Sequence, residues 1–238
     1  MNDINASENW EFFDQVYCIS VSNRTERRAE AQKQFEKVGL KEKVEFVIVE
    51  KNTKSPEKGI YDSHQACIRR GLQAGASRIL IFEDDIIFDR FEINCLKQCI
   101  NFLSERSEWN LLHFGCIVKS SKKTNNPSVL EISYRCLAHA YVINNRFAQI
   151  LEKIPWDGVP YDRLLAKYEG QYAAYPSFAF QSNSLTDNDR LVRLDKFRRA
   201  IGGLRRIQKL NEMFHRHKII IIIVNIVILV LLLKLIIK

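Results

Sequence analysis

Three consecutive carboxylates, Glu83, Asp84 and Asp85, are the residues of this chain whose type and spacing first suggest chemistry. They end an apolar run, 79–82, that is rich in β-branched and aromatic residues and reads as a buried strand. Three adjacent acids repel one another unless a positive group lies among them. The pattern therefore favours a site with a positive partner, and a solvated junction between strand and loop is the alternative.

The elements before these acids alternate along the chain. Apolar runs predict strands over 15–21, 44–50 and 78–85, and helical patterns cover 25–39 and 63–76. This βαβαβ order predicts an α/β domain with a mostly parallel sheet, in which ligands bind beyond the carboxyl ends of the strands. The acids lie at such an end. Further on we expect a helix over 91–105, a strand over 109–115, a polar loop over 119–128, a strand over 135–144 and a helix over 145–154.

The positive charge of the chain is concentrated in its tail. The formal net charge is +8, and from Lys196 onward ten lysines and arginines face one acid, Glu212. Residues 1–195 therefore carry a charge of about −1. A basic tail on a nearly neutral domain gives no reason to expect a nucleic-acid partner.

Two segments follow the predicted catalytic domain, which we place at 1–195. Apolar residues at spacings of three and four predict a basic amphipathic helix over 196–217, and a helix that caps the domain is the alternative. The run over 218–238 predicts a single C-terminal transmembrane helix, with a buried core helix as the alternative. With no signal peptide visible, these segments predict a membrane-anchored protein whose catalytic domain is cytoplasmic.

Four blocks of sequence occur in the order and spacing of a known family. They read "VYCISVSNRTERR", "DSHQACIRRGLQAGASRILIFEDDIIF", "HAYVINNRFAQIL" and "VPYDRLLAKYEGQYAAYPSFAFQ", and together they span about residues 14–185. In this the chain resembles glycosyltransferase family 25, which comprises lipopolysaccharide-type and collagen-type sugar transferases. The resemblance implies a GT-A fold, which is an α/β sandwich that binds a nucleotide sugar, and an inverting transfer that yields a β-linked sugar.

The resemblance also implies the ligands. We expect a UDP-sugar as donor, a glycan or glycolipid of the lipopolysaccharide type as acceptor, and Mn²⁺ or Mg²⁺ as the metal. Such a metal, held by carboxylates, neutralises the diphosphate that leaves as the glycosidic bond breaks. Because alternate residues of an extended segment share a side, Glu83 and Asp85 face one way and Asp84 the other.

The site residues are assigned by matching these blocks. Asp85 is the expected metal ligand, with Glu83 as a second ligand, and Glu83 or Asp84 orients it or contacts the ribose. The donor is further expected to meet Asn23, Arg24, Arg27, Ser63 and His64. For Arg27 the alternative is a charge on a helix surface, and for His64 it is a cap or a packed histidine.

Asp162, in the last block, is the expected general base that takes the proton of the acceptor hydroxyl. Asp157 and Asp187 are alternatives, and Asp162 could instead cap the helix that follows it. In the first block Ser20 departs from the family pattern, which leaves the contacts to the nucleotide base open. Three hypotheses follow: an active glycosyltransferase, a degenerate member that binds without turnover, and a metal-dependent phosphohydrolase.

Overall fold

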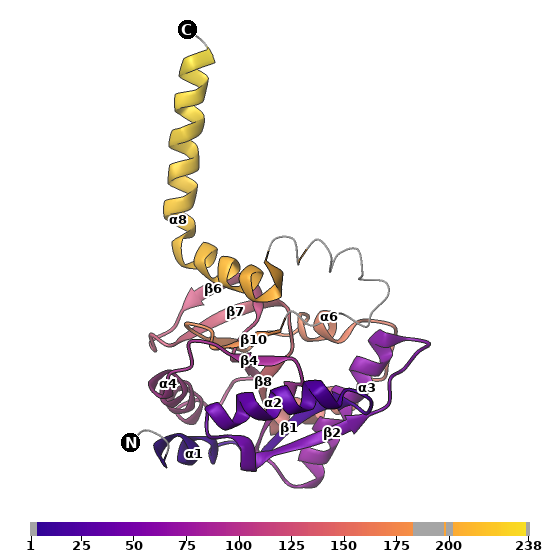
Figure 1. The fold of residues 1–238 in the computed structure, drawn as a ribbon. Coiled ribbons are helices and arrows are strands. Elements are labelled where there is room, and N and C mark those ends of the chain that lie inside the picture. Colours follow the sequence, from indigo (N-terminus) through magenta and orange to yellow (C-terminus); the bar gives the residue numbers. More distant parts are fainter. Residues whose placement is uncertain (1–3, 183–197, 199–201, 237–238) are drawn as a thin grey trace.

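A computed structural model describes residues 4–182, 198 and 202–236 of the chain, with side chains from Ser7 to Ile228 within those ranges (Figure 1). Its strands are β1 (Gln15–Val21), β2 (Val44–Val49), β3 (Arg78–Glu83), β4 (Ile86–Phe88), β5 (Leu111–His113), β6 (Ile117–Lys123), β7 (Val129–Cys136), β8 (Ala140–Asn144), β9 (Gln171–Ala174) and β10 (Ala179–Gln181). Its α-helices are α1 (Ile4–Trp10), α2 (Thr25–Lys37), α3 (Pro56–Gln73), α4 (Ile93–Ser104), α5 (Asn145–Glu152), α6 (Tyr161–Leu165) and α8 (Gly203–Ile236).

Eight strands form one central sheet in the order β2-β1-β3-β8-β5-β9-β7-β6. β1 pairs in parallel with β2 and β3, and β5 pairs in parallel with β9. β8 and β7 run antiparallel to their neighbours, so six of the eight strands point the same way. The predicted α/β fold with a mostly parallel central sheet is therefore confirmed. The two short strands β4 and β10 pair antiparallel in a second sheet.

Helices cover both faces of the central sheet, and this explains the unbroken apolar run of β3. Leu80 and Phe82 face the core formed with α1, α2 and α4. Ile79 and Ile81 face the opposite core, which α3, α5 and α6 complete. A strand buried on both sides has no polar face to present to water, so its sequence shows no alternation.

Three elements differ from the sequence expectation. The expected strand over 135–144 is divided, because β7 ends at Cys136 and β8 begins at Ala140. The polar segment 119–128, expected as a loop, is largely the hairpin of β6 and β7 at the edge of the sheet. Much of β6 is exposed, so its lysines and serines face water and conceal the strand pattern. Helix α3 begins at Pro56, capped by Ser55, seven residues before the expected start at residue 63.

The first part of α8 packs against β6 and β10, where polar side chains fix it in place. Gln208 is 1% exposed and donates to the Ala179 oxygen over 2.9 Å. Asn211 exchanges hydrogen bonds of 3.0 and 3.1 Å with the backbone of Val118. Glu212 accepts from Arg90 through both carboxylate oxygens and from the Ser177 amide. From Gly203 on, the basic amphipathic segment is thus a helix that packs on the domain, which was the alternative interpretation.

The predicted transmembrane anchor over 218–238 is wrong. The predicted membrane localisation depended on this anchor and is therefore also wrong. Helical geometry in α8 is interrupted at His217 (φ −115, ψ 16). Within the described part of the chain, no helix is both long and apolar enough to cross a membrane.

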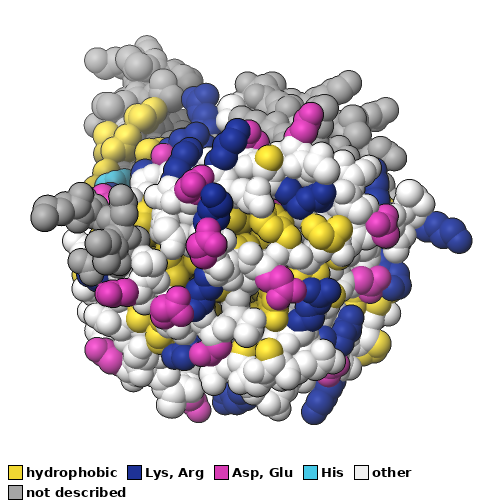
Figure 2. All heavy atoms as spheres, turned by 60° about the horizontal axis from the view of Figure 1, so that its bottom comes forward, with side chains coloured by type: hydrophobic (Ala, Val, Ile, Leu, Met, Phe, Trp, Pro, Cys, Tyr) yellow, Lys and Arg dark blue, Asp and Glu magenta, His cyan; other side chains and the backbone are white. Residues whose placement is uncertain are grey.

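Charges of both signs intermingle on the face drawn in Figure 2, where Lys and Arg side chains lie beside Asp and Glu side chains. A broad field of one sign, of the kind that gathers a polyanion, is not visible on that face.

Candidate active site

A cavity of about 660 Å³ lies at the carboxyl ends of β1, β2 and β3. Its walls also come from α3, the β7–β8 connection, α6, the end of β10 and the start of α8. Eight of the nine site residues expected from the sequence line it: Arg24, Arg27, Ser63, His64, Glu83, Asp84, Asp85 and Asp162. Asn23, in the turn between β1 and α2, is not among the lining residues. The topology thus brings together residues that are 138 positions apart, since Arg24 and Asp162 share one cavity.

The positive group that the three acids require is Arg27 of α2. Its Nε lies 3.2 Å from Asp84 Oδ1, and a terminal nitrogen lies 2.8 Å from Asp85 Oδ2. Asp84 is also held from the other side, because the Ser20 hydroxyl donates to it over 2.7 Å. Arg28 in turn donates to Ser20 and to backbone oxygens at the end of β1. Through these contacts Asp84, at the end of β3, links that strand to β1 and α2. Ser20, the residue that departs from the family pattern, provides the link to β1.

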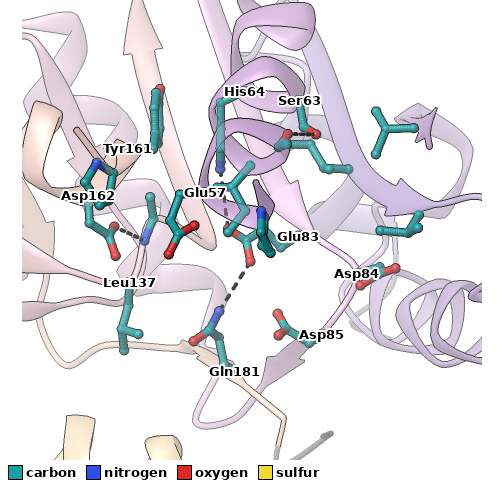
Figure 3. A pocket seen from close by; sticks show the side chains of 18 of the residues that line it. Glu57, Ser63, His64, Glu83, Asp84, Asp85, Leu137, Tyr161, Asp162 and Gln181 are labelled. Carbon is teal, nitrogen blue, oxygen red and sulfur yellow. Dashed lines mark hydrogen bonds and ion pairs between the residues drawn. The ribbon is translucent and has the colours of Figure 1, made fainter. Parts of the chain in front are cut away.

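Glu83 and Asp85 face the cavity, as Figure 3 shows, whereas Asp84 is turned toward α2. Burial is the main cause that raises the pKa of Glu83 to about 8, and the charges of Asp162 and Asp84 add to it. Burial, followed by the charge of Glu83, raises the pKa of Asp85 to about 7, although Arg27 opposes the rise. One guanidinium therefore does not fully offset the crowding of carboxylates.

His64 is packed behind Glu83 and is 1% exposed. Its Nε2 lies 3.4 Å from Glu83 Oε1, and its Nδ1 lies 2.9 Å from the Tyr141 hydroxyl. The ring stacks on Tyr161 at 4.2 Å between centroids, and the Tyr141 and Tyr161 hydroxyls lie 2.8 Å apart. Burial lowers the pKa of His64 to about 3, so the imidazole is neutral. The geometry gives His64 a role in orienting Glu83, which matches the packed alternative.

Asp162 lies across the cavity from Asp84 and Asp85 (Figure 3). Its Oδ1 accepts from the buried Tyr134 hydroxyl and, over 3.2 Å, from the Ala138 amide. Asp162 is the second residue of α6, whose cap position is Pro160, so it is not the N-cap of that helix. Asp157 is exposed, accepts from the Val159 amide and does not line the cavity. Asp187 lies outside the described residues.

The donor set for a cation is small. In the described part of the chain, no three histidines, cysteines or acids group closely enough to hold a metal ion. Among the carboxylates of the described residues, one buried oxygen nevertheless lacks a hydrogen-bond partner, namely Asp85 Oδ1. Mg²⁺ is commonly bound by one or two carboxylates together with substrate phosphates and water. Asp85 and Glu83 fit that mode, in which the substrate completes the shell.

Several lining residues were not singled out in the sequence. Gln181 of β10 donates to Glu83 over 3.4 Å, and the Ser182 amide donates to the Asp85 backbone oxygen over 2.7 Å. Leu204 enters the wall from α8 and Leu137 from the β7–β8 connection, where its φ of +79 is unusual for a branched residue. These residues are neutral, and only the tertiary fold brings them to the cavity.

Residues 48–165 match the family model of glycosyltransferase family 25 (LPS biosynthesis protein). None of the curated proteins is similar enough in sequence to count as a match. Similar solved structures include A197 from STIV, with 13% identity, 71% of this chain and 85% of that chain covered and a TM-score of 0.46. A putative glucose-1-phosphate thymidylyltransferase from Bacillus anthracis has 11% identity, covers 82% of each chain and has a TM-score of 0.45.

A third structure is a glycosyltransferase involved in glycosylation of the major capsid of PBCV-1. It has 10% identity, coverage of 64% of this chain and 74% of that chain, and a TM-score of 0.36. All three TM-scores are below 0.5.

Proposed function

We propose that the chain transfers a sugar from a nucleotide-sugar donor to a glycan acceptor with inversion, because residues 48–165 match the model of glycosyltransferase family 25. We further propose that the domain is of the GT-A type, that the donor is a UDP-sugar, and that the acceptor is a glycan or glycolipid of the lipopolysaccharide type. The observation that carries the proposal is the opposition of two carboxylate groups, Asp85 and Asp162, across a single cavity.

The donor diphosphate is assigned to the side of the cavity where β3 ends. Asp85 and Glu83 would hold Mn²⁺ or Mg²⁺ there, and when bound the cation supplies charge neutralisation for the leaving diphosphate. Arg27 already pairs with Asp85 and lies on the same wall as Arg24, so two guanidinium groups border this region. Guanidinium groups bind phosphate oxygens through paired hydrogen bonds.

The acceptor is assigned to the side of the cavity where α6 begins. Inversion requires a base on the face of the sugar opposite the leaving group, and a carboxylate can take the hydroxyl proton as the new bond forms. Asp162 is suited to this role because both of its hydrogen bonds go to Oδ1. Two donors on one oxygen fix the carboxylate plane, and the other oxygen is left for the acceptor hydroxyl.

The proposal is tested with the full chain and a panel of nucleotide sugars. We expect a UDP-sugar to raise the midpoint of thermal unfolding, and to raise it further with Mn²⁺, because a ligand that binds only the folded state stabilises it. Release of UDP should then depend on an added glycan. Stabilisation by no nucleotide sugar, or hydrolysis of simple phosphate esters by the same site, would contradict the proposal.

A further inference from the structure

One part of the cavity wall is not used by the proposed reaction. It consists of Cys136 and Leu137 at the end of β7, Arg163 on α6, Arg198, and Leu204 at the start of α8. Arg163 directly follows Asp162 in the chain, so this patch borders the acceptor side. Because the patch adjoins α6, we call these five residues the α6 wall, although only Arg163 belongs to that helix.

The two arginines of the α6 wall differ from the other cations of the cavity. Arg27 is paired with Asp84 and Asp85. Arg24 and Lys51 also have interaction partners. Arg163 and Arg198, by contrast, form no ion pair within 4.0 Å with any carboxylate of the described residues, while the rest of the α6 wall is apolar or a thiol. A guanidinium that has no carboxylate partner among the described residues can give its donors to an anionic ligand.

Asp162, Arg163 and Arg198 line the same cavity as Cys136. Burial raises the pKa of the Cys136 thiol to about 11, the charge of Asp162 raises it further, and the charges of Arg135 and Arg198 oppose the rise. Arg198 is half-buried and Arg163 is exposed, so both guanidinium groups are accessible from the cavity.

We propose that the acceptor carries an anionic group, a carboxylate or a phosphate, which Arg163 and Arg198 bind beside Asp162. This inference rests on the proposed function and adds the substrate class. Two guanidinium groups next to the base would hold an acidic sugar in one orientation and present its hydroxyl to Asp162. The donor diphosphate is assigned across the cavity at Asp85, so the two anions would occupy separate places.

The test uses matched small probes with the full chain, in the presence of saturating UDP and diamagnetic Mg²⁺ to occupy the donor side. Methyl β-glucuronide is compared with methyl β-glucoside, and glucose 6-phosphate with glucose, by ligand-observed NMR titration. The first pair measures the preference for a carboxylate, and the second pair measures the preference for a phosphate. The variants are Arg163→Gln, Arg198→Gln and their combination. Arg146→Gln, which removes an exposed arginine of α5 that does not line the cavity, is the matched control.

We expect at least one acidic probe to bind on the order of tenfold tighter than its neutral partner, because hydrogen bonds between ions are stronger than neutral ones. The double variant should lose this preference, and Arg146→Gln should keep it. Equal binding of acidic and neutral probes, or a preference that survives in the double variant, would overturn the inference. So would loss of UDP binding with probe binding unchanged, since the arginines would then serve the donor.

The same experiment separates this inference from the proposed function. If acidic probes bind through the two arginines but no acceptor in the panel receives a sugar, the anion subsite stands and the transfer proposal fails. If sugar is transferred equally well to acidic and neutral acceptors, in the parent and in the double variant, the transfer proposal stands and the anion subsite fails.

Discussion

The side-chain amide of Gln208 donates a 2.9 Å hydrogen bond to the backbone oxygen of Ala179. This bond joins α8 to β10 at a place where both residues are buried. Two positions after Ala179, Gln181 reaches Glu83 at the edge of the cavity. The helix that was expected to lead into a membrane therefore supports the strand that forms one wall of the site.

Gly115 tests this support. A Cβ added at Gly115 would lie 1.8 Å from the Ala179 oxygen and 2.5 Å from Gln208 Nε2, so Gly115→Ala must displace β10 or α8. We expect the free energy of unfolding to fall by roughly 1–3 kcal/mol, as for other overpacked sites. Urea denaturation measures this loss. Ser120→Ala, on the exposed side of β6, is the control and should change stability by less than about 0.5 kcal/mol. Equal stability of the two variants would show that α8 is not seated as described.

Asp85→Asn tests the cation site, because it removes the charge and keeps the volume. We expect the rate of sugar transfer to fall by on the order of 100-fold, since stabilisation of the leaving diphosphate would be lost. Transfer rates at saturating donor, with Mn²⁺ varied, measure the effect. Asp62→Asn, at a residue of α3 whose half-exposed side chain pairs with Lys58, is the control. Activity within a few-fold of the parent would refute the role of Asp85.

Asp162→Asn tests the base. We expect transfer to fall strongly while the affinity for the donor stays nearly unchanged, because the base acts on the acceptor. Donor binding is measured by calorimetry and transfer by product formation, so the two effects are separated. Asp157→Asn is the matched control because Asp157 lies outside the cavity. If Asp157→Asn or Asp187→Asn reproduces the pattern and Asp162→Asn does not, the base has been assigned to the wrong residue.

The crowded carboxylates predict a pH dependence of stability in the absence of divalent cations. In the folded protein the pKa of Asp85 is about 7, against an ordinary value of 3.8, and that of Glu83 is about 8, against 4.5. Between about pH 4 and pH 8 the folded state thus holds more protons than the unfolded state, so stability falls as pH rises. Thermal unfolding in EDTA from pH 5 to 8.5 should show a smaller fall for Asp85→Asn than for the parent. If the unfolding midpoints of the parent and of Asp85→Asn change with pH in parallel, the protonation of Asp85 is not linked to stability.

The sequence allowed the N-terminal half of the fold and most of the candidate site to be predicted. Local patterns sufficed for β1 and β3, because a strand buried on both faces is apolar throughout. They failed for β6, whose exposed lysines and serines resemble a loop. They also failed for the C-terminal segment, because no helix in the described part of the chain is both long and apolar enough to cross a membrane.

The pairings inside the site were beyond the reach of sequence patterns. Arg27 was expected to meet the donor, and the structure places it between Asp84 and Asp85. The bond from Tyr134 to Asp162 joins residues 28 positions apart, and that from Ser20 to Asp84 joins residues 64 positions apart. Such contacts depend on the order of strands in the sheet, which no local periodicity specifies.

The packing of α8 on the domain also has a consequence for the order of folding. Asp89 bonds to Arg205 across 116 positions, and Arg90 bonds to Glu212 across 122 positions. Contacts so distant along the chain form late, because closing the long loop costs entropy before the contact contributes any stability. During synthesis the parallel core of β1, β2 and β3 can assemble while α8 is still being made. A nascent chain can therefore acquire its carboxylate cluster before the cavity around that cluster is closed.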